Sequence, residues 1–474
     1  MNVKKTSLEI IALLRSNFPV DIFSFATEEC VHYGSDWTRV FIPNPIGICF
    51  PRTTLEVSQI LKFCNEHEIS IVPSGGRTGL AGGAVAHSGE LVLSLERMNK
   101  VYEPSIEAES IRVESGVITE AVSRACEKHG LHWPISMASQ GSSQIGGNLA
   151  TNAGGVHVVH YGMTRDWVLG IKVVLMDGSI LDINGELEKN NTGLDLKNLF
   201  IGSEGTLGII TEAHLKLCKI PAQKMTYFFS LVNLDAIKKL FLKCRSTEKS
   251  IFTFEVISQN SLSCVEKTFN IQNPIAKKTF AYALVEFVSD SHLSIAQELD
   301  NWAVSLSEDG TVDNCFAPQS SAERLLIWKL REGITESLQN ESVVHKNDVS
   351  VPVKHLSSFL NDCIEHCDSN NSKLYWFGHY GDGNLHLNTL MGPDINKEEF
   401  LKKMREQDKS IFTLVQKYNG SISAEHGIGL LKKEYLSYSK SEDEIRIMTA
   451  IKNVFDPKGL LNPGKVYLSK LNGQ

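Results

Sequence analysis

The sequence predicts a large globular protein of two or three domains that combines helices and strands. Its 474 residues exceed what one ordinary hydrophobic core organises. Hydrophobic residues make up 42% of the chain and charged residues 22%, a balance typical of soluble proteins. Glycine gathers in a few loops that border apolar, strand-like runs.

Charge and segment composition exclude several classes of protein. The net charge of −8 argues against nucleic-acid binding, which needs a basic face. Leu8, Ile11, Leu14 and Phe18 fall at helical spacing, so we expect an amphipathic N-terminal helix and not a signal peptide. No run approaches the roughly 20 apolar residues of a membrane span. The ten cysteines form no CxxC pair, so we expect free thiols and a cytoplasmic protein.

Three glycine-rich loops occupy residues 73–83, 139–155 and 200–211. Backbone without Cβ atoms approaches a ligand closely, and successive amides form an anion-binding nest. Any one loop alone is more simply a surface turn, but three that border apolar strands predict one large phosphate-bearing cofactor. No Rossmann fingerprint is present. The GLLNPGK segment is not a P-loop, because Val466 replaces the required Ser or Thr.

A second group of polar residues lies near the end of the chain. His379 and His386 fall within GHYGDGNLHLN, and Glu425 and His426 within AEHGIG. Two imidazoles and a carboxylate suit a divalent metal with one open coordination position, and His426 would then be a nearby base. The alternative is that these are ordinary polar residues around the Gly-Asp-Gly turn at 381–383.

A third group offers cations for an anionic substrate. Arg331 and Thr335 are four residues apart and are expected on one helix face, and Lys346 opens a strand-like run. A guanidinium suits bidentate carboxylate binding, and an ammonium reaches a second anion. The alternative is that Arg331 pairs with Glu332 or Glu336 on a solvated helix.

The three loops resemble the flavin-binding segments of the vanillyl-alcohol oxidase / p-cresol methylhydroxylase superfamily of FAD enzymes. The motifs GHYGDGNLHLN, AEHGIG and FDPKGLLNPGK resemble its D-2-hydroxyacid dehydrogenase branch, most closely the D-2-hydroxyglutarate dehydrogenases. The similarity runs from about Asp36 to Lys465. It implies an α+β fold with a two-subdomain FAD-binding domain of the vanillyl-alcohol oxidase type over residues 1–217. It also implies a substrate (cap) domain built on an antiparallel sheet with helices over 218–419, and a segment over 420–474 that returns to the flavin with a metal ligand and the base.

In many members of this superfamily a histidine of the first loop tethers the flavin covalently. Here residues 75–79 contain no His or Cys, so the resemblance implies non-covalent FAD. Arg77 either pairs with the pyrophosphate or faces solvent. The residues expected to contact FAD are Pro73, Gly75, Gly76, Arg77, Thr78, Gly79, Gly141, Ser142, Gly146, Gly147, Asn148, Thr151, Asn152, Gly155, Gly205, Gly208, Ile210 and Asn462.

The resemblance also implies roles on the substrate side. Arg331, Thr335 and Lys346 match, at the same spacing, the residues that hold substrate in D-2-hydroxyglutarate dehydrogenases, whereas lactate-type members tend to lack the lysine. A substrate with a second carboxylate is therefore favoured.

By the same similarity His379, His386 and Glu425 would be metal ligands, with zinc the first choice and manganese, cobalt or iron open. His426 would be the base, because a histidine is largely neutral at pH 7. Asn388 would contact the substrate, since on a strand it points to the same side as His386.

The implied reaction is oxidation of a D-2-hydroxyacid by proton removal at the hydroxyl and hydride transfer from C2 to flavin N5. Two alternatives stay open: a D-lactate or glycolate dehydrogenase, and a flavin subunit of a larger electron-transfer complex. The expected partners are the small-molecule substrate and a separate electron acceptor, either an electron-transfer flavoprotein or a quinone. A homodimer is also an expectation of this branch.

Overall fold

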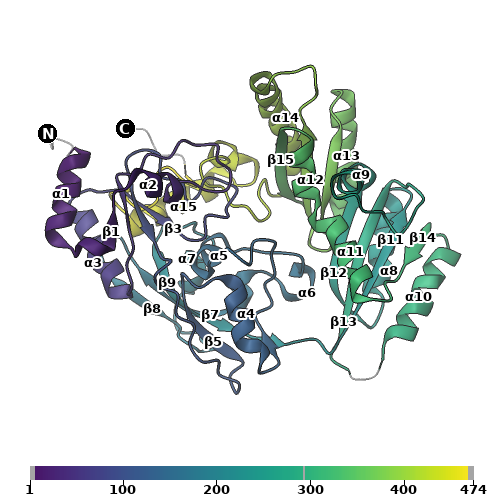
Figure 1. Cartoon of the computed structure of the whole chain (residues 1–474), viewed down its shortest axis with the longest axis horizontal. Helices are drawn as coiled ribbons and strands as arrows, with labels where there is room; N and C mark the ends of the chain where they lie inside the picture. Colours follow the sequence, from purple (N-terminus) through teal and green to yellow (C-terminus); the bar gives the residue numbers. More distant parts are fainter. Residues whose placement is uncertain (1–5, 292–293, 468–474) are drawn as a thin grey trace. The chain divides into compact units, whose positions relative to one another are not determined.

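A computed structural model describes residues 6–291 and 294–467, which fall into two compact units. The first unit combines the described residues of Met1–Gly155, Met163–Ile220 and Glu425–Gln474, and the second combines Val156–Gly162 with those of Pro221–Ala424. In Figure 1 the first unit is drawn in purple to blue with a yellow C-terminal part, and most of the second in teal and green. No helix in the described ranges has the length and apolarity that crossing a membrane requires.

The domain boundaries expected at 217/218 and 419/420 stay a prediction. The division by contacts falls at 220/221 and 424/425. It also moves the short segment Val156–Gly162 to the second unit, where the ring of His157 packs on Phe252 with centroids 3.9 Å apart.

The first unit contains two four-stranded sheets. One has the order β1-β2-β4-β3, with parallel pairing of β4 to both β2 and β3. The other is antiparallel, in the order β5-β9-β7-β8. The bounds of these strands are β1 Phe23–Ser24, β2 Gly47–Cys49, β3 Ile71–Ser74, β4 Leu91–Ser94, β5 Ser110–Glu114, β7 Val168–Val174, β8 Ile180–Ile183 and β9 Ile209–Lys216; β6 Leu131–His132 pairs separately with β10 Cys218–Lys219.

Helices of the first unit begin where the sequence supplies caps. The Thr6 side chain accepts from the backbone amide of Glu9, and the Glu9 carboxylate accepts from the backbone amide of Thr6. This capping box starts the predicted N-terminal helix. Ser441 and Glu444 form the same box at α15. The helices are α1 Ser7–Asn17, α2 Thr27–Tyr33, α3 Thr54–Glu66, α4 Thr119–Glu127, α5 Ile145–Thr151, α7 Lys197–Phe200 and α15 Glu442–Phe455, with 3-10 turns at η1 Val20–Ile22, η2 Thr164–Trp167 and η5 Lys433–Tyr438.

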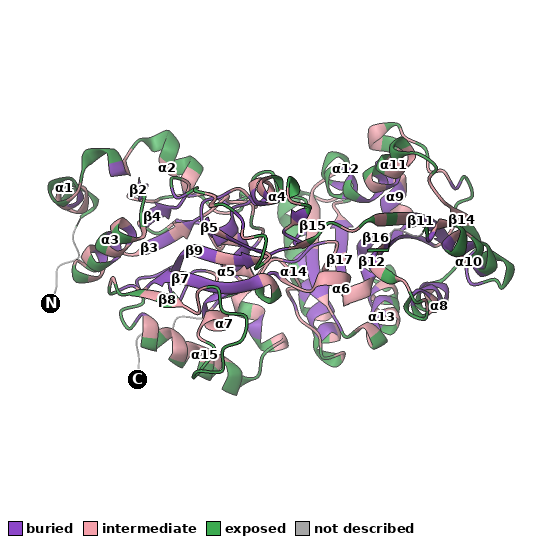
Figure 2. Cartoon of the chain, turned by 90° about the horizontal axis from the view of Figure 1, so that it is seen from below, coloured by how far each residue is buried: buried purple, intermediate pink, exposed green. Residues whose placement is uncertain are grey.

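The apolar strands beside the glycine loops form the cores of this unit. Strands β7 and β9 are buried along most of their length, as Figure 2 shows, because helices or loops cover both of their faces. One core cluster joins the antiparallel sheet to α4 and α5, and another joins α3 to β3 and β4. This packing fixes the ends of the strands, and therefore the glycine loops that border them.

The second unit is built on one antiparallel sheet of seven strands, in the order β14-β11-β13-β12-β16-β17-β15. Its strands are β11 Gln223–Leu231, β12 Ser250–Ser258, β13 Ala281–Ser289, β14 Asn314–Phe316, β15 Val344–Ser350, β16 Leu374–His379 and β17 Asn384–Leu390. Its helices are α6 Val158–Tyr161, α8 Leu234–Arg245, α9 Gln259–Phe269, α10 Ala296–Glu308, α11 Ser321–Glu332, α12 Ile334–Glu341, α13 Leu356–Ser369 and α14 Lys397–Lys417, with η3 Val353–His355 and η4 Tyr380–Asp382.

Helices cover both faces of this sheet. An apolar cluster packs α9, α11 and α12 on the face that carries Ile257, Leu284 and Phe377. On the opposite face α10 contacts β11 through the bond from Tyr227 Oη to Asp300, 2.7 Å long. The antiparallel sheet with helices expected for the substrate domain is therefore present.

Candidate active site

A pocket in the first unit lies between the three glycine loops. It is lined by residues of all three loops. Thirteen of the eighteen residues expected at FAD line it. They are Pro73, Gly75, Gly76, Arg77, Thr78, Gly79, Gly146, Gly147, Asn148, Thr151, Gly205, Gly208 and Ile210.

Several of these glycines leave room that a side chain would take. A Cβ atom added at Gly79 or Gly147 meets no atom within 4 Å, although both residues line the pocket. Added side chains would project into open space there, so the glycines keep a cradle clear for a ligand. The loops present therefore fit a phosphate-bearing cofactor such as FAD.

The other five expected residues, Gly141, Ser142, Asn152, Gly155 and Asn462, do not line the pocket. Two of them, Gly155 and Asn462, hold the loops in place by close backbone packing and by hydrogen bonds. A Cβ atom at Gly155 would lie 1.7 Å from the carbonyl oxygen of Ser136, so only glycine fits. The Asn462 amide donates to the carbonyl oxygens of Gly83 and Glu204 at 3.0 and 2.7 Å, which ties the C-terminal segment to two loops.

Arg77 is half-buried, and its pairing with the pyrophosphate stays a prediction. Its guanidinium donates back to the carbonyl oxygen of Gly75 at 3.0 Å and lies 4.4 Å from the ring centroid of Tyr33. A further contact of 3.1 Å joins it to the His32 ring. Arg77 thus braces the first loop while also lining the pocket.

His426, the expected base, lines the same pocket. The loop that carries it is anchored by Glu204, whose carboxylate accepts from the amides of Ile428 and Gly429 at 2.7 and 2.9 Å. Burial raises the pKa of Glu204, and the two amide bonds oppose that rise. This role of Glu204 was not predicted from the sequence, although a lone carboxylate in the GSEGTLG loop was a visible signal.

In the second unit the predicted substrate and metal residues share one sheet face. Cross-strand partners lie on the same side of a sheet. Lys346 on β15 faces Asn388 on β17, and Asp348 on β15 faces His386 on β17. The strand predicted from Lys346 and the common side of His386 and Asn388 are both confirmed.

A buried carboxylate joins two of these functional candidates. His379 donates from Nδ1 to Glu255 at 2.5 Å, and Arg331 donates from Nε to the other oxygen of Glu255 at 2.6 Å. Glu255 is completely buried, and Arg331 is 7% exposed. Burial alone would raise the pKa of Glu255, but the charges of Arg331 and His379 outweigh it and hold that pKa below its ordinary value.

This pairing replaces the alternative in which Arg331 bonds to Glu332 or Glu336 on a solvated helix. The expectation that Arg331 and Thr335 share one continuous helix face was wrong, because α11 ends at Glu332 and α12 begins at Ile334. Arg331 is buried and Thr335 is exposed.

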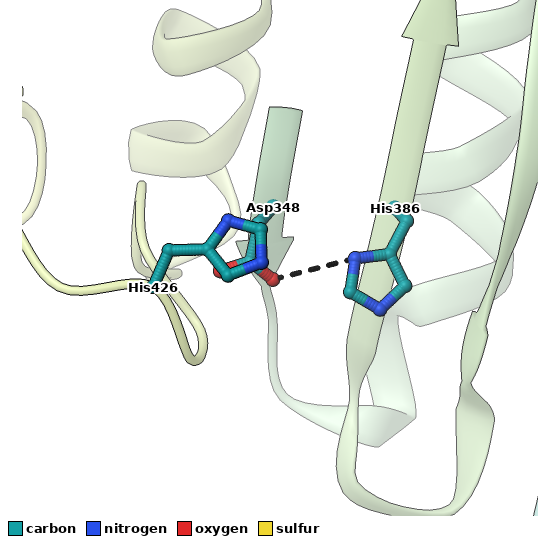
Figure 3. A group of neighbouring side chains, drawn as sticks. All are labelled: Asp348, His386 and His426. Carbon is teal, nitrogen blue, oxygen red and sulfur yellow. Dashed lines mark ion pairs between the residues drawn. The ribbon is translucent and has the colours of Figure 1, made fainter. Parts of the chain in front are cut away.

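The second histidine also has a carboxylate neighbour. Asp348 is 1% exposed, and its oxygen lies 3.7 Å from Nδ1 of His386, the pair marked in Figure 3. The rings of His379 and His386 have centroids 5.4 Å apart, edge to face. Histidines that bind metals usually donate from their second nitrogen to a carboxylate, as His379 does to Glu255, so these two imidazoles fit the nitrogen donors of a divalent metal.

The amine of Lys346 is half-buried, and burial lowers its pKa. Asn388 is 3% exposed and donates its amide to the carbonyl oxygen of Tyr375 at 3.0 Å. Glu255 and Asp348 were missed by the sequence analysis. Glu255 had a visible signal, an acidic residue within the largely apolar strand IFTFEVIS, whereas Asp348 lies in the polar strand VHKNDVS and had none.

Two family models match the chain. The model described as FAD binding domain matches residues 45–184, and the model described as FAD linked oxidases, C-terminal domain, matches residues 220–466. The second match alone covers more than half of the chain.

Several relatives are similar over most of their length. A D-2-hydroxyglutarate dehydrogenase of Stutzerimonas stutzeri is 41% identical over 437 residues, covering 92% of this chain and 94% of the relative. One from Xanthomonas citri pv. viticola is 41% identical over 438 residues, covering 92% of each. A mitochondrial protein of Schizosaccharomyces pombe, named as a putative D-lactate dehydrogenase, is 36% identical, and the match covers 96% of this chain and 86% of the relative.

Solved structures agree on the fold. The p-cresol methylhydroxylase structure with bound substrate superimposes with a TM-score of 0.76 at 16% identity, covering 99% of this chain and 97% of that one. The 4-ethylphenol oxidase of Gulosibacter chungangensis gives a TM-score of 0.72 at 17% identity, covering 94% of each. The α+β fold of the vanillyl-alcohol oxidase type is confirmed. The chain belongs to the FAD-linked oxidases of the vanillyl-alcohol oxidase / p-cresol methylhydroxylase superfamily, in the branch of the D-2-hydroxyacid dehydrogenases.

Proposed function

We propose that this protein is an FAD- and metal-dependent dehydrogenase that oxidises a D-2-hydroxyacid, D-2-hydroxyglutarate above all, to the 2-oxoacid. The observation that carries the proposal is the row of buried polar residues on one face of the seven-stranded sheet, where Glu255 anchors Arg331 and His379. The 41% identity to D-2-hydroxyglutarate dehydrogenases over nine-tenths of the chain supports the same substrate.

The chain's own residues would bind both cofactors. The glycine loops of the first unit would hold FAD without a covalent bond, because residues 75–79 offer no His or Cys. His379, His386 and Glu425 would hold the metal, with zinc first among several divalent ions. When bound, the flavin accepts the hydride and the metal lowers the pKa of the substrate's 2-hydroxyl group.

Substrate orientation would come from Arg331 on α11, Thr335 on α12 and Lys346 on β15. Arg331 would bind the C1 carboxylate, and Lys346 with Thr335 would bind the distal carboxylate. Lys346 and Asn388 are paired across β15 and β17, which keeps the amine on the same side as the amide. His426, at the flavin pocket, would accept the hydroxyl proton.

Anaerobic titration tests this function. Purified, metal-replete protein would be titrated with D-2-hydroxyglutarate, D-lactate and glycolate, and oxidised flavin absorbance followed near about 450 nm. Bleaching by D-2-hydroxyglutarate with little response to the monocarboxylates is expected. Bleaching by D-lactate alone would contradict a binding site for a second carboxylate and favour a D-lactate dehydrogenase instead. The 36% identity to the Schizosaccharomyces pombe protein supports that second candidate.

No bleaching by any of the three acids would favour a flavin subunit that works only within a larger complex. The proposal includes an electron-transfer flavoprotein or a quinone as electron acceptor, a homodimer, and a cytoplasmic location. Turnover with each acceptor, light scattering and cell fractionation would test these points in turn. Some relatives carry the word mitochondrial in their names, so fractionation needs both compartments.

A further inference from the structure

Glu255 stands at the centre of the sheet face and bonds to two different structural elements. Its strand, β12, neighbours β16, where Glu255 pairs directly with His379. Its second oxygen accepts from Arg331 at the end of α11. The carboxylate is completely buried, so both oxygens are committed to protein partners rather than to solvent.

Each hydrogen bond of Glu255 determines how its partner side chain is held. Donation from Nδ1 of His379 to the carboxylate places the imidazole proton on Nδ1, which makes Nε2 the nitrogen suited to bind a metal. The bond to Nε of Arg331 holds the guanidinium 4.7 Å from the ring centroid of Phe377. One carboxylate therefore sets both the tautomer of a histidine and the position of an arginine.

A second buried carboxylate on the same face has different partners. Glu286 on β13 is also completely buried, and it lies opposite Thr253 of β12. It accepts from Thr226 at 2.8 Å and from the indole of Trp328 at 3.0 Å. Burial of a carboxylate is thus common to both sites, whereas contact with predicted functional residues is recorded for Glu255 and not for Glu286.

We infer that Glu255 is a positioning residue that couples the metal site to the substrate site, by orienting His379 for the metal and Arg331 for the substrate carboxylate. The inference rests on the proposed function, because it takes His379 as a metal ligand and Arg331 as a substrate ligand. Glu255 itself touches neither ligand and acts through its two partners.

The test compares Glu255→Gln with Glu286→Gln in FAD-loaded protein freed of metal by EDTA. Glutamine keeps the size of the side chain, but it removes the charge and presents an amide to His379, which disfavours the metal-binding tautomer. Titration with Zn²⁺ against a competing chelator should show affinity about 10- to 100-fold weaker for Glu255→Gln. Glu286→Gln should bind Zn²⁺ like the unaltered protein.

A kinetic readout separates positioning from damage to the core. At saturating Zn²⁺ the kcat of Glu255→Gln should recover substantially, while KM for D-2-hydroxyglutarate stays about tenfold raised, because Arg331 has lost its anchor. The matched Glu286→Gln variant should show no such split, even where its thermal unfolding midpoint falls as far.

Other outcomes would overturn the inference. Unchanged Zn²⁺ affinity and KM in folded Glu255→Gln would do so. If Glu255→Gln does not fold, Glu255→Asp takes its place. Aspartate keeps the charge, but its side chain is one methylene too short to reach both His379 and Arg331. Unchanged Zn²⁺ affinity and KM in Glu255→Asp would also overturn the inference. Failure of both to fold, beside folded Glu286→Gln, would assign Glu255 to the core instead. Unchanged Zn²⁺ affinity in His379→Ala would instead contradict the proposed metal site, a separate result.

Discussion

Lys346 carries the discrimination between substrates with one and two carboxylates. Its amine is half-buried beside Asn388, where a charge-assisted bond to an anion is stronger than in open solvent. Lys346→Ala should lower kcat/KM for D-2-hydroxyglutarate roughly 10- to 100-fold, the loss expected for a bond worth about 1.5–3 kcal/mol. Steady-state kinetics with D-lactate should change by less than about threefold.

The control for this prediction is Lys354→Ala, which removes an exposed lysine from η3, just after the same strand. It should leave both substrates unaffected. Equal losses on D-2-hydroxyglutarate and D-lactate in Lys346→Ala would show that the lysine does not read the second carboxylate.

Lys465 is a buried lysine that lowers the stability of the folded state by an amount that depends on pH. It is 1% exposed, and its amine makes no hydrogen bond to any residue that the structure describes. Burial lowers its pKa to about 8, partly offset by Glu90 and reinforced by Lys433. Below pH 8 the lysine is charged in both the folded and unfolded states, so the burial penalty is fully present. As pH rises through 8 toward the unfolded value of 10.5, the folded state loses its proton first and the penalty declines.

Lys465→Met should therefore raise the unfolding midpoint at pH 7, by a gain of about 1–3 kcal/mol in stability. The gain should shrink at pH 9.5. Urea unfolding at the two pH values measures this, and an equal gain at both would contradict the burial penalty as its cause.

At the scale of elements, the loop after His426 depends on glycine. Gly429 has φ +48°, and a Cβ atom there would lie 2.1 Å from the carbonyl oxygen of Ala81. Gly429→Ala should destabilise the first unit by about 1–3 kcal/mol and lower the bound flavin content, because the loop packs on residues that line the pocket. Thermal unfolding and the ratio of flavin to protein absorbance measure both effects.

Gly392→Ala is the matched control, since a Cβ atom there meets nothing within 4 Å. It should leave stability and flavin content unchanged. A folded Gly429→Ala variant with full flavin would mean that the loop tolerates a shift away from Ala81.

At the scale of the whole molecule, two of the three proposed metal ligands lie outside the unit that lines the flavin pocket. The flavin pocket is lined by residues of the first unit, and His379 and His386 belong to the second. EDTA treatment should abolish substrate-dependent flavin bleaching while the flavin absorbance itself is retained, and added Zn²⁺ or Mn²⁺ should restore it. Full activity in protein shown by elemental analysis to lack metal would contradict a metal-dependent reaction.

Local sequence patterns were enough to predict the cofactor pocket and the side of a strand on which two site residues lie. Glycine loops beside apolar strands predicted the cofactor pocket, and thirteen of eighteen expected residues line it. The two-residue spacing of His386 and Asn388 predicted their common side, because the strand period is two. The break between α11 and α12 was missed, since Gly333 continues with nearly helical dihedral angles and gives no strong stop signal.

The sequence by itself determined the family, the flavin loops and the identity of the polar residues, because those depend on local composition and spacing. Only the tertiary structure decided which of these residues bond to one another. Glu255 lies 76 residues from Arg331 and 124 from His379 along the chain, and strand register brings the three together. Register among seven antiparallel strands is set by packing of whole faces, so no short segment of sequence encodes it.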